Sequence, residues 1–236
     1  MSYNALSRFY DRLIDFDHQQ LLAMLGQVKG VRSLDLACGT GIFTRLLAKA
    51  GASVEGVDLS DDMLEVAMDV SRKEGYRILY RQGDIRSFSF TRPYGLVTII
   101  CDGLNYVPPK QLSEALSHVA SAIEEGGKLA FDLSTPYKLR NVLGDQLYYE
   151  DGEDLTYYWQ NTLHTRSHSV EMQLTFFEKQ GELYRRLDEE QTQYWHEMDE
   201  VQSALSSAGL TLVSCTDDKG NEPQEDSQRW VFVAKK

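Results

Sequence analysis

The sequence predicts a doubly wound α/β fold, in which helices cover both faces of a seven-stranded sheet and an antiparallel β lid is inserted into the second half. Strand and helix patterns alternate through the first half of the chain. A period-2 pattern replaces them further on, and one helix with two strands ends the chain. We expect an α/β core over residues 1–146, the lid over 147–195, and a closing helix and hairpin over 196–236.

The strands expected in the first half are short and apolar, and each leads into a turn or a helix. The helices carry apolar residues at spacings of three and four, and glycines stop the first two. Strands that alternate with helices imply right-handed crossovers and therefore a parallel sheet. The predicted strands are 32–36, 53–57, 77–81, 96–101 and 128–133, and the predicted helices are 42–50, 61–74 and 111–122. A turn is expected at Gly126 and Gly127.

Three segments of the second half are predicted to be strands joined by short polar turns, namely 156–163, 170–177 and 183–192. In 170–177 apolar and polar residues alternate, which is typical of a strand with one buried and one wet face. A helix is expected over 198–208, ended by Gly209, and strands over 210–215 and 230–234 complete the main sheet.

Composition and charge argue against several classes of protein. The formal net charge of -12 repels phosphate backbones and anionic lipids, so nucleic acid is not an expected partner. The start lacks a signal-peptide pattern, and no apolar run approaches the roughly 20 residues that cross a bilayer, so we expect a cytoplasmic protein without membrane contact. The three cysteines, Cys38, Cys101 and Cys215, are too scattered for a disulfide framework or a thiolate zinc site.

A glycine-bearing turn joins the first strand to the first helix, in Leu34-Asp35-Leu36-Ala37-Cys38-Gly39-Thr40-Gly41. Glycines let the backbone approach a ligand, and a helix N-terminus offers unpaired amides. A dinucleotide site would use G-x-G-x-x-G, but Thr44 stands in place of the third glycine. Asp35 would oppose a pyrophosphate, whereas it suits a ligand with an amino group and a sulfonium. A purely structural turn is the alternative.

Acidic residues follow the next two strands. Asp58 lies about 20 residues after Gly39, where a carboxylate can accept both hydroxyls of a ribose. A helix cap is the alternative for Asp58 or Ser60. Asp84 is placed to accept from an adenine amino group while Ile85 covers the ring, and a turn aspartate is the alternative.

These elements in this order resemble the class I S-adenosylmethionine-dependent methyltransferases, and the resemblance runs over nearly the whole chain. LDLACGTG resembles the glycine-rich cofactor loop of that family, VDLSDDML its ribose-binding strand end, and GDI its adenine-contacting segment. CDGLNY, EGGKL and FDL are similar to segments of a bacterial branch of small-molecule methyltransferases whose substrates are largely unassigned. That branch is similar in outline to the sugar N-methyltransferases of antibiotic pathways. The resemblance implies a Rossmann-like sheet and S-adenosylmethionine as cofactor.

The resemblance also implies individual roles by position. Gly39 and Gly41 would pass the methionine moiety, Asp58 would bind the ribose, and Asp84 with Ile85 the adenine. Tyr3 and Tyr10 correspond to residues that cover the cofactor in such proteins. The implied cofactor-binding set also contains Asp35, Ala37, Cys38, Leu59, Met63 and Cys101.

The end of the fourth strand faces the transferred methyl in this family, so the reaction type is expected in Cys101 to Tyr106. The motifs of enzymes that methylate nucleic-acid bases are missing there. We expect Cys101 to be a buried thiol rather than a nucleophile. Asp102 is the candidate catalytic residue, which would orient or deprotonate an acceptor, and a turn-forming aspartate is the alternative.

Two further patterns in the lid carry no site prediction. His164 and His168 are four residues apart but on a turn and without a third ligand, so no metal site is expected. The acidic run Asp188 to Glu190 is expected to be a solvated face.

The sequence therefore favours an enzyme that transfers a methyl group from S-adenosylmethionine to a nitrogen or oxygen of a small molecule, by in-line displacement. The aromatic residues of the lid would exclude water and line an acceptor pocket, or else form cross-strand packing pairs. A non-catalytic S-adenosylmethionine sensor or interaction module is one alternative. A nicotinamide-dependent oxidoreductase is another, which rests on fold analogy alone.

Overall fold

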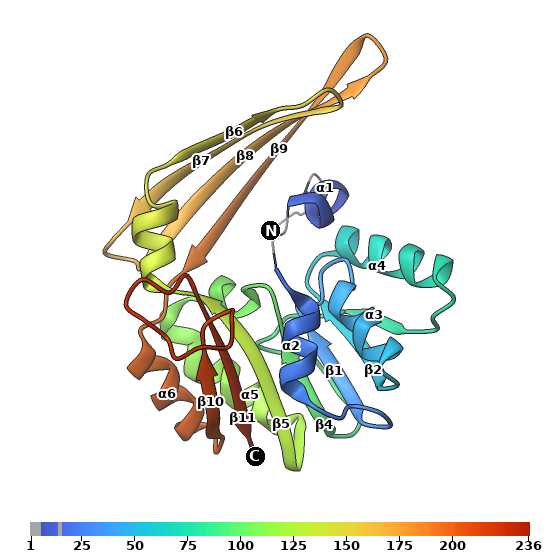
Figure 1. The fold of residues 1–236 in the computed structure, drawn as a ribbon, viewed down its shortest axis with the longest axis vertical. Coiled ribbons are helices and arrows are strands. Elements are labelled where there is room, and N and C mark those ends of the chain that lie inside the picture. Colours follow the sequence, from blue (N-terminus) through green and yellow to red (C-terminus); the bar gives the residue numbers. More distant parts are fainter. Residues whose placement is uncertain (1–5, 14–15) are drawn as a thin grey trace.

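A seven-stranded sheet forms the centre of the protein in the computed structural model, which describes residues 6–13 and 16–236 (Figure 1). The strand order is β10-β11-β5-β4-β1-β2-β3. The strands are β1 (Arg32–Leu36), β2 (Ser53–Asp58), β3 (Leu79–Gln82), β4 (Tyr94–Ile99), β5 (Ile123–Ser134), β10 (Thr211–Thr216) and β11 (Arg229–Lys235). The predicted doubly wound α/β sheet is confirmed.

The order of the strands creates a crevice at one edge of the sheet. Strands β1 to β5 are parallel, and β11 runs antiparallel between β5 and β10. The direction of winding reverses at β1, which lies between β4 and β2. In open α/β sheets a ligand crevice forms at such a point, beyond the carboxyl ends of the strands. Asp58, Asp84 and Asp102 all lie at this edge, at or just beyond the ends of β2, β3 and β4.

Helices cover both faces of the sheet. The helices are α1 (Leu6–Leu13), α2 (His18–Leu25), α3 (Ile42–Lys49), α4 (Asp61–Lys73), α5 (Leu112–Ser121) and α6 (Met198–Ser207). On one face α2 and α3 bury Leu21 and Leu47 against the strands. On the other face α5 and α6 bury a second core that includes Leu116 and Val201. Burial of these apolar faces is the main favourable term in the stability of such a core.

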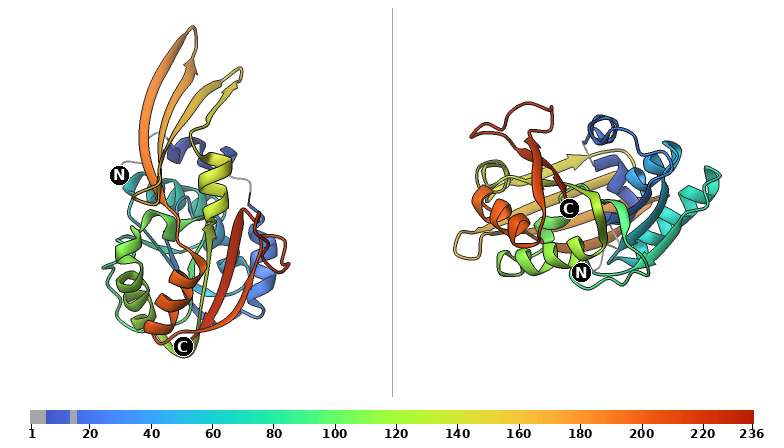
Figure 2. Two further views of the ribbon diagram at one scale, coloured as in Figure 1. Left: turned by 90° about the vertical axis from the view of Figure 1, so that its left-hand side faces the viewer. Right: turned by 90° about the horizontal axis from the view of Figure 1, so that it is seen from below.

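The lid is a four-stranded antiparallel sheet, in the order β6-β7-β8-β9, which projects away from the core (Figures 1 and 2). Its strands are β6 (Leu147–Asp151), β7 (Leu155–His164), β8 (Ser169–Gln180) and β9 (Leu183–Tyr194). Alternate residues of β8, from Val170 to Phe176, are buried, and the Phe176 ring packs against Phe9 of α1. The predicted lid is confirmed, whereas the division into domains after residues 146 and 195 stays a prediction.

Several elements differ from those predicted. β6 was missed because most of its residues are exposed and no alternation marks it. Helices α1 and α2 and the π-helix Lys138–Leu143 were also missed, since each is too short to show a sustained apolar period. β5 begins at Ile123 and so includes Gly126 and Gly127, but the expected turn is present as a bulge, since the pairing with β4 shifts register there and Gly126 has a φ of +80°. Among the described residues, no helix has the length and apolar character needed to cross a bilayer.

Candidate active site

A left-handed turn between β1 and α3 forms the first part of the site. Gly39 and Gly41 have φ angles of +53° and +77°, and Gly41 is the N-cap of α3. A Cβ atom on Gly41 would lie 2.6 Å from the Tyr80 hydroxyl, so a side chain there would displace Tyr80. Gly41 therefore packs against Tyr80, and it does not line the cavity described below.

Asp35 supports this turn from within β1. Its side chain is buried and accepts hydrogen bonds from the hydroxyls of Thr44 and Thr98, each at 2.6 Å. Burial raises the pKa of Asp35 to about 6, and the two hydroxyls limit the rise because they stabilise the carboxylate. Asp35 thus ties α3 and β4 to β1.

Asp58 connects the end of β2 to the same turn. One carboxylate oxygen accepts from the backbone N–H of Gly39 at 2.8 Å and the other from that of Ser60 at 2.9 Å. The Ser60 hydroxyl accepts from the N–H of Met63 and caps α4. The helix cap is therefore Ser60, and Asp58 holds the glycine turn. Burial raises the pKa of Asp58, and the backbone N–H groups oppose this rise.

A cavity, which we call the strand-end pocket, opens beyond the carboxyl ends of β1 to β4. Most of its surface is apolar, with the Asp58 carboxylate among its few polar groups. Such a slot suits a flat ring system joined to a hydroxylated sugar. The predicted residues that line it are Tyr10, Ala37, Gly39, Asp58, Leu59, Met63, Asp84, Ile85 and Cys101.

Asp84 lines the strand-end pocket beside Arg86, with which it forms an ion pair. Its carboxylate accepts from Arg86 Nε at 2.9 Å and from the Arg86 backbone N–H at 2.8 Å. The hydrogen bonds from Arg86 lower the pKa of Asp84. Any bond from Asp84 to an adenine amino group would therefore be shared with Arg86, and that role stays a prediction.

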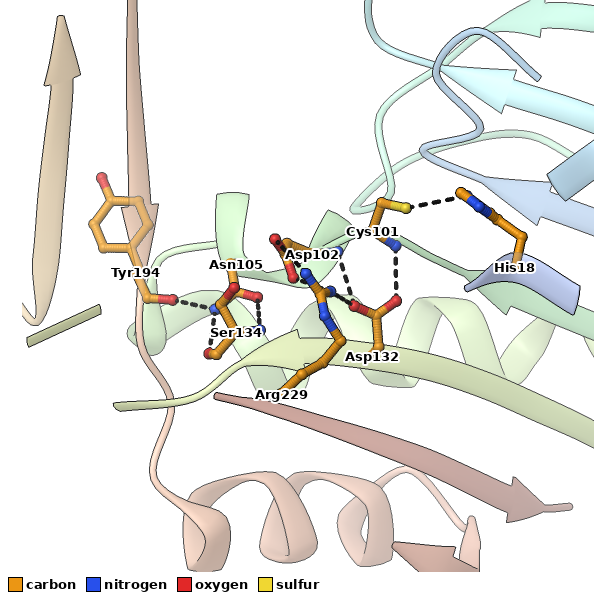
Figure 3. A network of polar contacts seen from close by, with 8 residues as sticks. All are labelled: His18, Cys101, Asp102, Asn105, Asp132, Ser134, Tyr194 and Arg229. Atoms are coloured by element: carbon orange, nitrogen blue, oxygen red, sulfur yellow. Dashed lines mark hydrogen bonds and ion pairs between the residues drawn. The ribbon is translucent and has the colours of Figure 1, made fainter. Parts of the chain in front are cut away.

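Cys101 and Asp102 form a strained elbow directly after β4. Their φ angles are +60° and +65°, a region that costs a non-glycine residue about 1–2 kcal/mol. Asp132 on β5 holds the elbow, because its carboxylate accepts from the backbone N–H of Cys101 at 2.7 Å and of Asp102 at 3.2 Å (Figure 3). The elbow leads into a 3-10 helix, Gly103–Tyr106.

Arg229, the first residue of β11, completes a buried ion triad with Asp102 and Asp132 (Figure 3). Its Nη1 contacts both carboxylates. Burial by itself would raise the pKa of Asp102, but the charges of Arg229 and Lys138 hold it below its usual value. Burial raises the pKa of Asp132, the more deeply buried acid. One guanidinium thus balances two carboxylates at the elbow.

Two more contacts fix the surroundings of the elbow. Cys101 Sγ lies 3.4 Å from His18 Nε2, and burial raises the pKa of this thiol well above its usual value. Asn105 donates to the carbonyl oxygens of Ser134 at 3.0 Å and of Tyr194 at 2.9 Å, and so joins the elbow to the last strand of the lid (Figure 3). The lid is therefore anchored at its base.

Comparison with known proteins decides the family. The pattern of a family described as "Methyltransferase domain" matches residues 34–127, which contain the glycine turn, Asp58, Asp84 and the elbow. The methyltransferase-family protein GWCH70_2453 of Geobacillus sp. (strain WCH70) is 33% identical over the full length of both chains. The chain belongs to the class I S-adenosylmethionine-dependent methyltransferases.

Solved structures of other methyltransferases share the fold. An S-adenosylmethionine-dependent methyltransferase from Clostridium acetobutylicum superposes with a TM-score of 0.89 at 28% identity, over 99% of this chain and 98% of that one. The sugar N-methyltransferase KedS8 from Streptoalloteichus sp. superposes with a TM-score of 0.74 at 19% identity, over 98% of this chain and 92% of that one. The lid is thus part of an architecture that this methyltransferase has in common with them.

The strand-end pocket of this methyltransferase fits S-adenosylmethionine, its cofactor. Among its lining residues, Asp58 would offer a carboxylate to the ribose hydroxyls, and Leu59, Met63 and Ile85 would offer apolar walls to the adenine. Among the residues that the structure describes, a Cβ on Gly39 would meet only Tyr10, at 3.7 Å, so this side of the turn has room for a ligand. When bound, S-adenosylmethionine supplies an electrophilic methyl group on a positively charged sulfur.

A second cavity of about 270 Å³, which we call the lid chamber, lies between the elbow and the inward face of the lid. Tyr106 donates a hydrogen bond to the side-chain oxygen of Gln191 at 2.9 Å, and Gln191 donates in turn to Glu189. The prediction of a solvated face at Asp188 to Glu190 is wrong for Glu189, which is 7% exposed. Glu189 therefore lies on the buried face of β9, where it is hydrogen-bonded to Gln191.

The structure brings most of the predicted site residues together. Asp35 and Cys38 line a small cavity that adjoins the strand-end pocket, beside Tyr10 and His18. Gly41 lies behind the turn, and Tyr3 lies outside the described residues. Within the described part of the chain, no three His, Cys, Asp or Glu side chains gather as metal ligands would.

The sequence did not reveal Asp132, Arg229, Gln191 and Gln193 as site residues. Asp132 interrupts an apolar strand and Arg229 begins another, but the two are 97 residues apart, so no local pattern pairs them. Gln191 and Gln193 share a strand face with Glu189, and that face is the buried one. Because residues 188–193 are polar on both faces, the sequence does not show which face is buried.

Proposed function

We propose that this methyltransferase transfers the methyl group to a nitrogen or oxygen atom of a small molecule held in the lid chamber. One observation carries the proposal: Tyr10, Cys101 and Tyr106 line both the strand-end pocket and the lid chamber. A donor in the first cavity and an acceptor in the second would therefore meet at these three residues. In-line displacement needs such a placement, with the acceptor atom opposite the departing sulfur.

The residues at this meeting point favour an acceptor whose reacting nitrogen or oxygen atom is itself uncharged when bound. Burial raises the pKa of both Tyr10 and Cys101 well above their usual values, so neither ionises near neutral pH. Alignment of two reactants can by itself remove about 7–11 kcal/mol from a barrier. The chain would then act mainly by positioning, with little need for a strong base.

Asp102 remains the candidate that touches the acceptor. It lines the lid chamber, but its carboxylate is paired with Arg229 and its pKa is held low. A carboxylate in this state is a weak base, whereas it can still accept a hydrogen bond from an acceptor. These contacts support an orienting role for Asp102 over proton removal.

A small-molecule acceptor also agrees with the charge and size of the site. The chain carries a net charge of -12, which opposes close approach of a nucleic acid. The lid chamber is large enough for a single ring with its substituents. KedS8 is named as a sugar N-methyltransferase, and at 19% identity it supports the fold and leaves the acceptor open.

The proposal is tested by acceptor-dependent release of S-adenosylhomocysteine from a broad panel of amines, alcohols, phenols and acids, with mass spectrometry of the product. An Asp58→Asn variant serves as the control, because it should lose donor binding and turnover together. Turnover with a small molecule supports the proposal. Tight binding of S-adenosylhomocysteine without turnover on any acceptor would favour a sensor and refute the transfer step.

A further inference from the structure

Lys138 is the cation of the lid chamber that no carboxylate neutralises directly. It is half-buried and lines the chamber at the start of the π-helix that leads into the lid. Its backbone N–H donates to the Thr135 hydroxyl at 3.1 Å, which fixes the turn that presents it. In the described part of the chain, no carboxylate oxygen lies within 4.0 Å of its ammonium group, although ion pairs at that distance occur on both the lid and the core.

The other charges of the chamber are already used. Asp102 is the acidic residue of the chamber lining, and Arg229 binds it as well as Asp132 behind it. Lys138 acts on Asp102 through its charge, but at longer range than an ion pair. Of the two cations in the described part of the lining, Arg229 is therefore balanced by Asp102 and Asp132, whereas Lys138 has no carboxylate in direct contact.

The remaining walls of the chamber suit a flat apolar body. Tyr157 and Trp159 come from β7, and Met172 and Leu174 from β8. Ligand pockets commonly combine such apolar and aromatic walls with a few charged or polar groups that fix the orientation of the ligand, and here Lys138 is such a group. An exposed acid would gain little from a lone surface lysine, but partial exclusion of water strengthens such a pairing.

We propose that the acceptor carries an acidic group, a carboxylate or a phosphate, and that Lys138 binds this group within the lid chamber. The inference rests on the proposed function, because it names the class of molecule that the lid chamber would take. The acidic group would lie beside Lys138 and orient the ring, so that a nitrogen or oxygen atom elsewhere on the molecule reaches Tyr10, Cys101 and Tyr106. A protonated amine would be disfavoured in the same place.

The test uses three probes of nearly the same shape and different charge: benzoate, benzamide and benzamidine. Binding of each to the full chain saturated with S-adenosylhomocysteine is measured by ligand-observed NMR. Phenyl phosphate is added as a fourth probe, to distinguish a carboxylate site from a phosphate site. We expect the anions to bind more tightly than benzamide, and benzamidine to bind most weakly.

Variants then assign the preference to Lys138. Lys138→Gln should weaken binding of benzoate or phenyl phosphate by about tenfold, the effect of one charge-assisted hydrogen bond, and leave benzamide unchanged. Lys179→Gln is the matched control, since Lys179 is exposed near the far end of β8. Lys138→Arg should retain the preference for anions.

The outcomes separate this inference from the proposed function. Equal binding of all three benzene probes, no binding of any probe, or an anion preference that survives in Lys138→Gln would each overturn the acidic-acceptor inference. S-adenosylhomocysteine binding is recorded for every variant by calorimetry. Loss of that binding in the unmodified chain would instead refute the donor site, on which the proposed function depends.

Discussion

Replacement of Arg229 by Met should strongly destabilise the protein. Methionine keeps much of the apolar stem but removes the guanidinium that contacts both Asp102 and Asp132. Asp132 is fully buried and Asp102 is 15% exposed, so water cannot replace the guanidinium. Loss of one partner from a buried ion pair costs about 3–5 kcal/mol. For a chain of this size, the corresponding fall in Tm is about 6–20 °C.

The pH dependence of this loss is the sharper test. Without Arg229, the pKa of the buried Asp132 carboxyl rises further in the folded state, while the unfolded value stays near 3.8. The folded variant then binds more protons than the unfolded chain, so its free energy of unfolding falls as pH rises above about 4. The loss of unfolding free energy relative to the unmodified protein should therefore be smaller near pH 5 than near pH 8. Urea denaturation of both proteins at both pH values measures this loss.

Two companion variants make the result specific. Arg229→Met combined with Asp132→Asn removes the uncompensated charge and should recover part of the lost stability. Arg186→Met is the matched control, because the Arg186–Asp188 pair lies on the lid with side chains 63% and 58% exposed. Such an exposed pair contributes little to stability, because water and salt screen it. A loss below about 1 kcal/mol in Arg229→Met, or an equal loss at both pH values, would refute the triad as a stabilising element.

Three further predictions concern the glycine turn and its supports. Asp58→Asn should weaken S-adenosylhomocysteine binding by about tenfold or more, since a charge-assisted hydrogen bond contributes roughly 1.5–3 kcal/mol. Calorimetry measures the affinity, and an unchanged value would show that Asp58 does not bind the donor. Gly41→Ala should lower the free energy of unfolding by about 1–3 kcal/mol, because alanine is strained at this left-handed φ and its Cβ would clash with Tyr80. Adding Tyr80→Phe should restore part of the loss. Chemical denaturation measures both variants, and no effect of Gly41→Ala would contradict the packing described. The pKa of Asp35 is raised from 3.8 to about 6 on folding, so its contribution to stability is full below pH 4 and is lost as pH rises to 6. Asp35→Asn should therefore flatten the stability profile over that range, and an unchanged slope would show that another group titrates there.

The sequence was sufficient for the elements whose pattern is local. β1 and the start of α3 were predicted at the residues where they occur, because an apolar strand, a glycine turn and an amphipathic helix each leave a short-range signal. The donor side of the site followed from the same residues. The sequence did not predict β6 or the π-helix. β6 is mostly exposed and the π-helix is short, so neither shows a hydrophobic periodicity.

The acceptor side depends on contacts between distant parts of the chain. Tyr106 reaches Gln191 across 85 residues, and Arg229 reaches Asp102 across 127. No property of Asp102 by itself indicates that a guanidinium binds it, so a free catalytic carboxylate and a locked one were equally compatible with the sequence. Only the pairing of β11 with β5 distinguishes them.

The position of β11 at the end of the chain also bears on when the protein can fold during its synthesis. During synthesis the N-terminal parts of a domain emerge and begin to fold first. Strands β1 to β5 would then be complete while the chain still lacks the residue that neutralises Asp102 and Asp132. An unfinished polypeptide that ends before Arg229 would carry two uncompensated acids beside the methyl-transfer site. Ribosome-bound chains of increasing length should therefore acquire protease resistance and cofactor binding together, at the point where the last strand emerges.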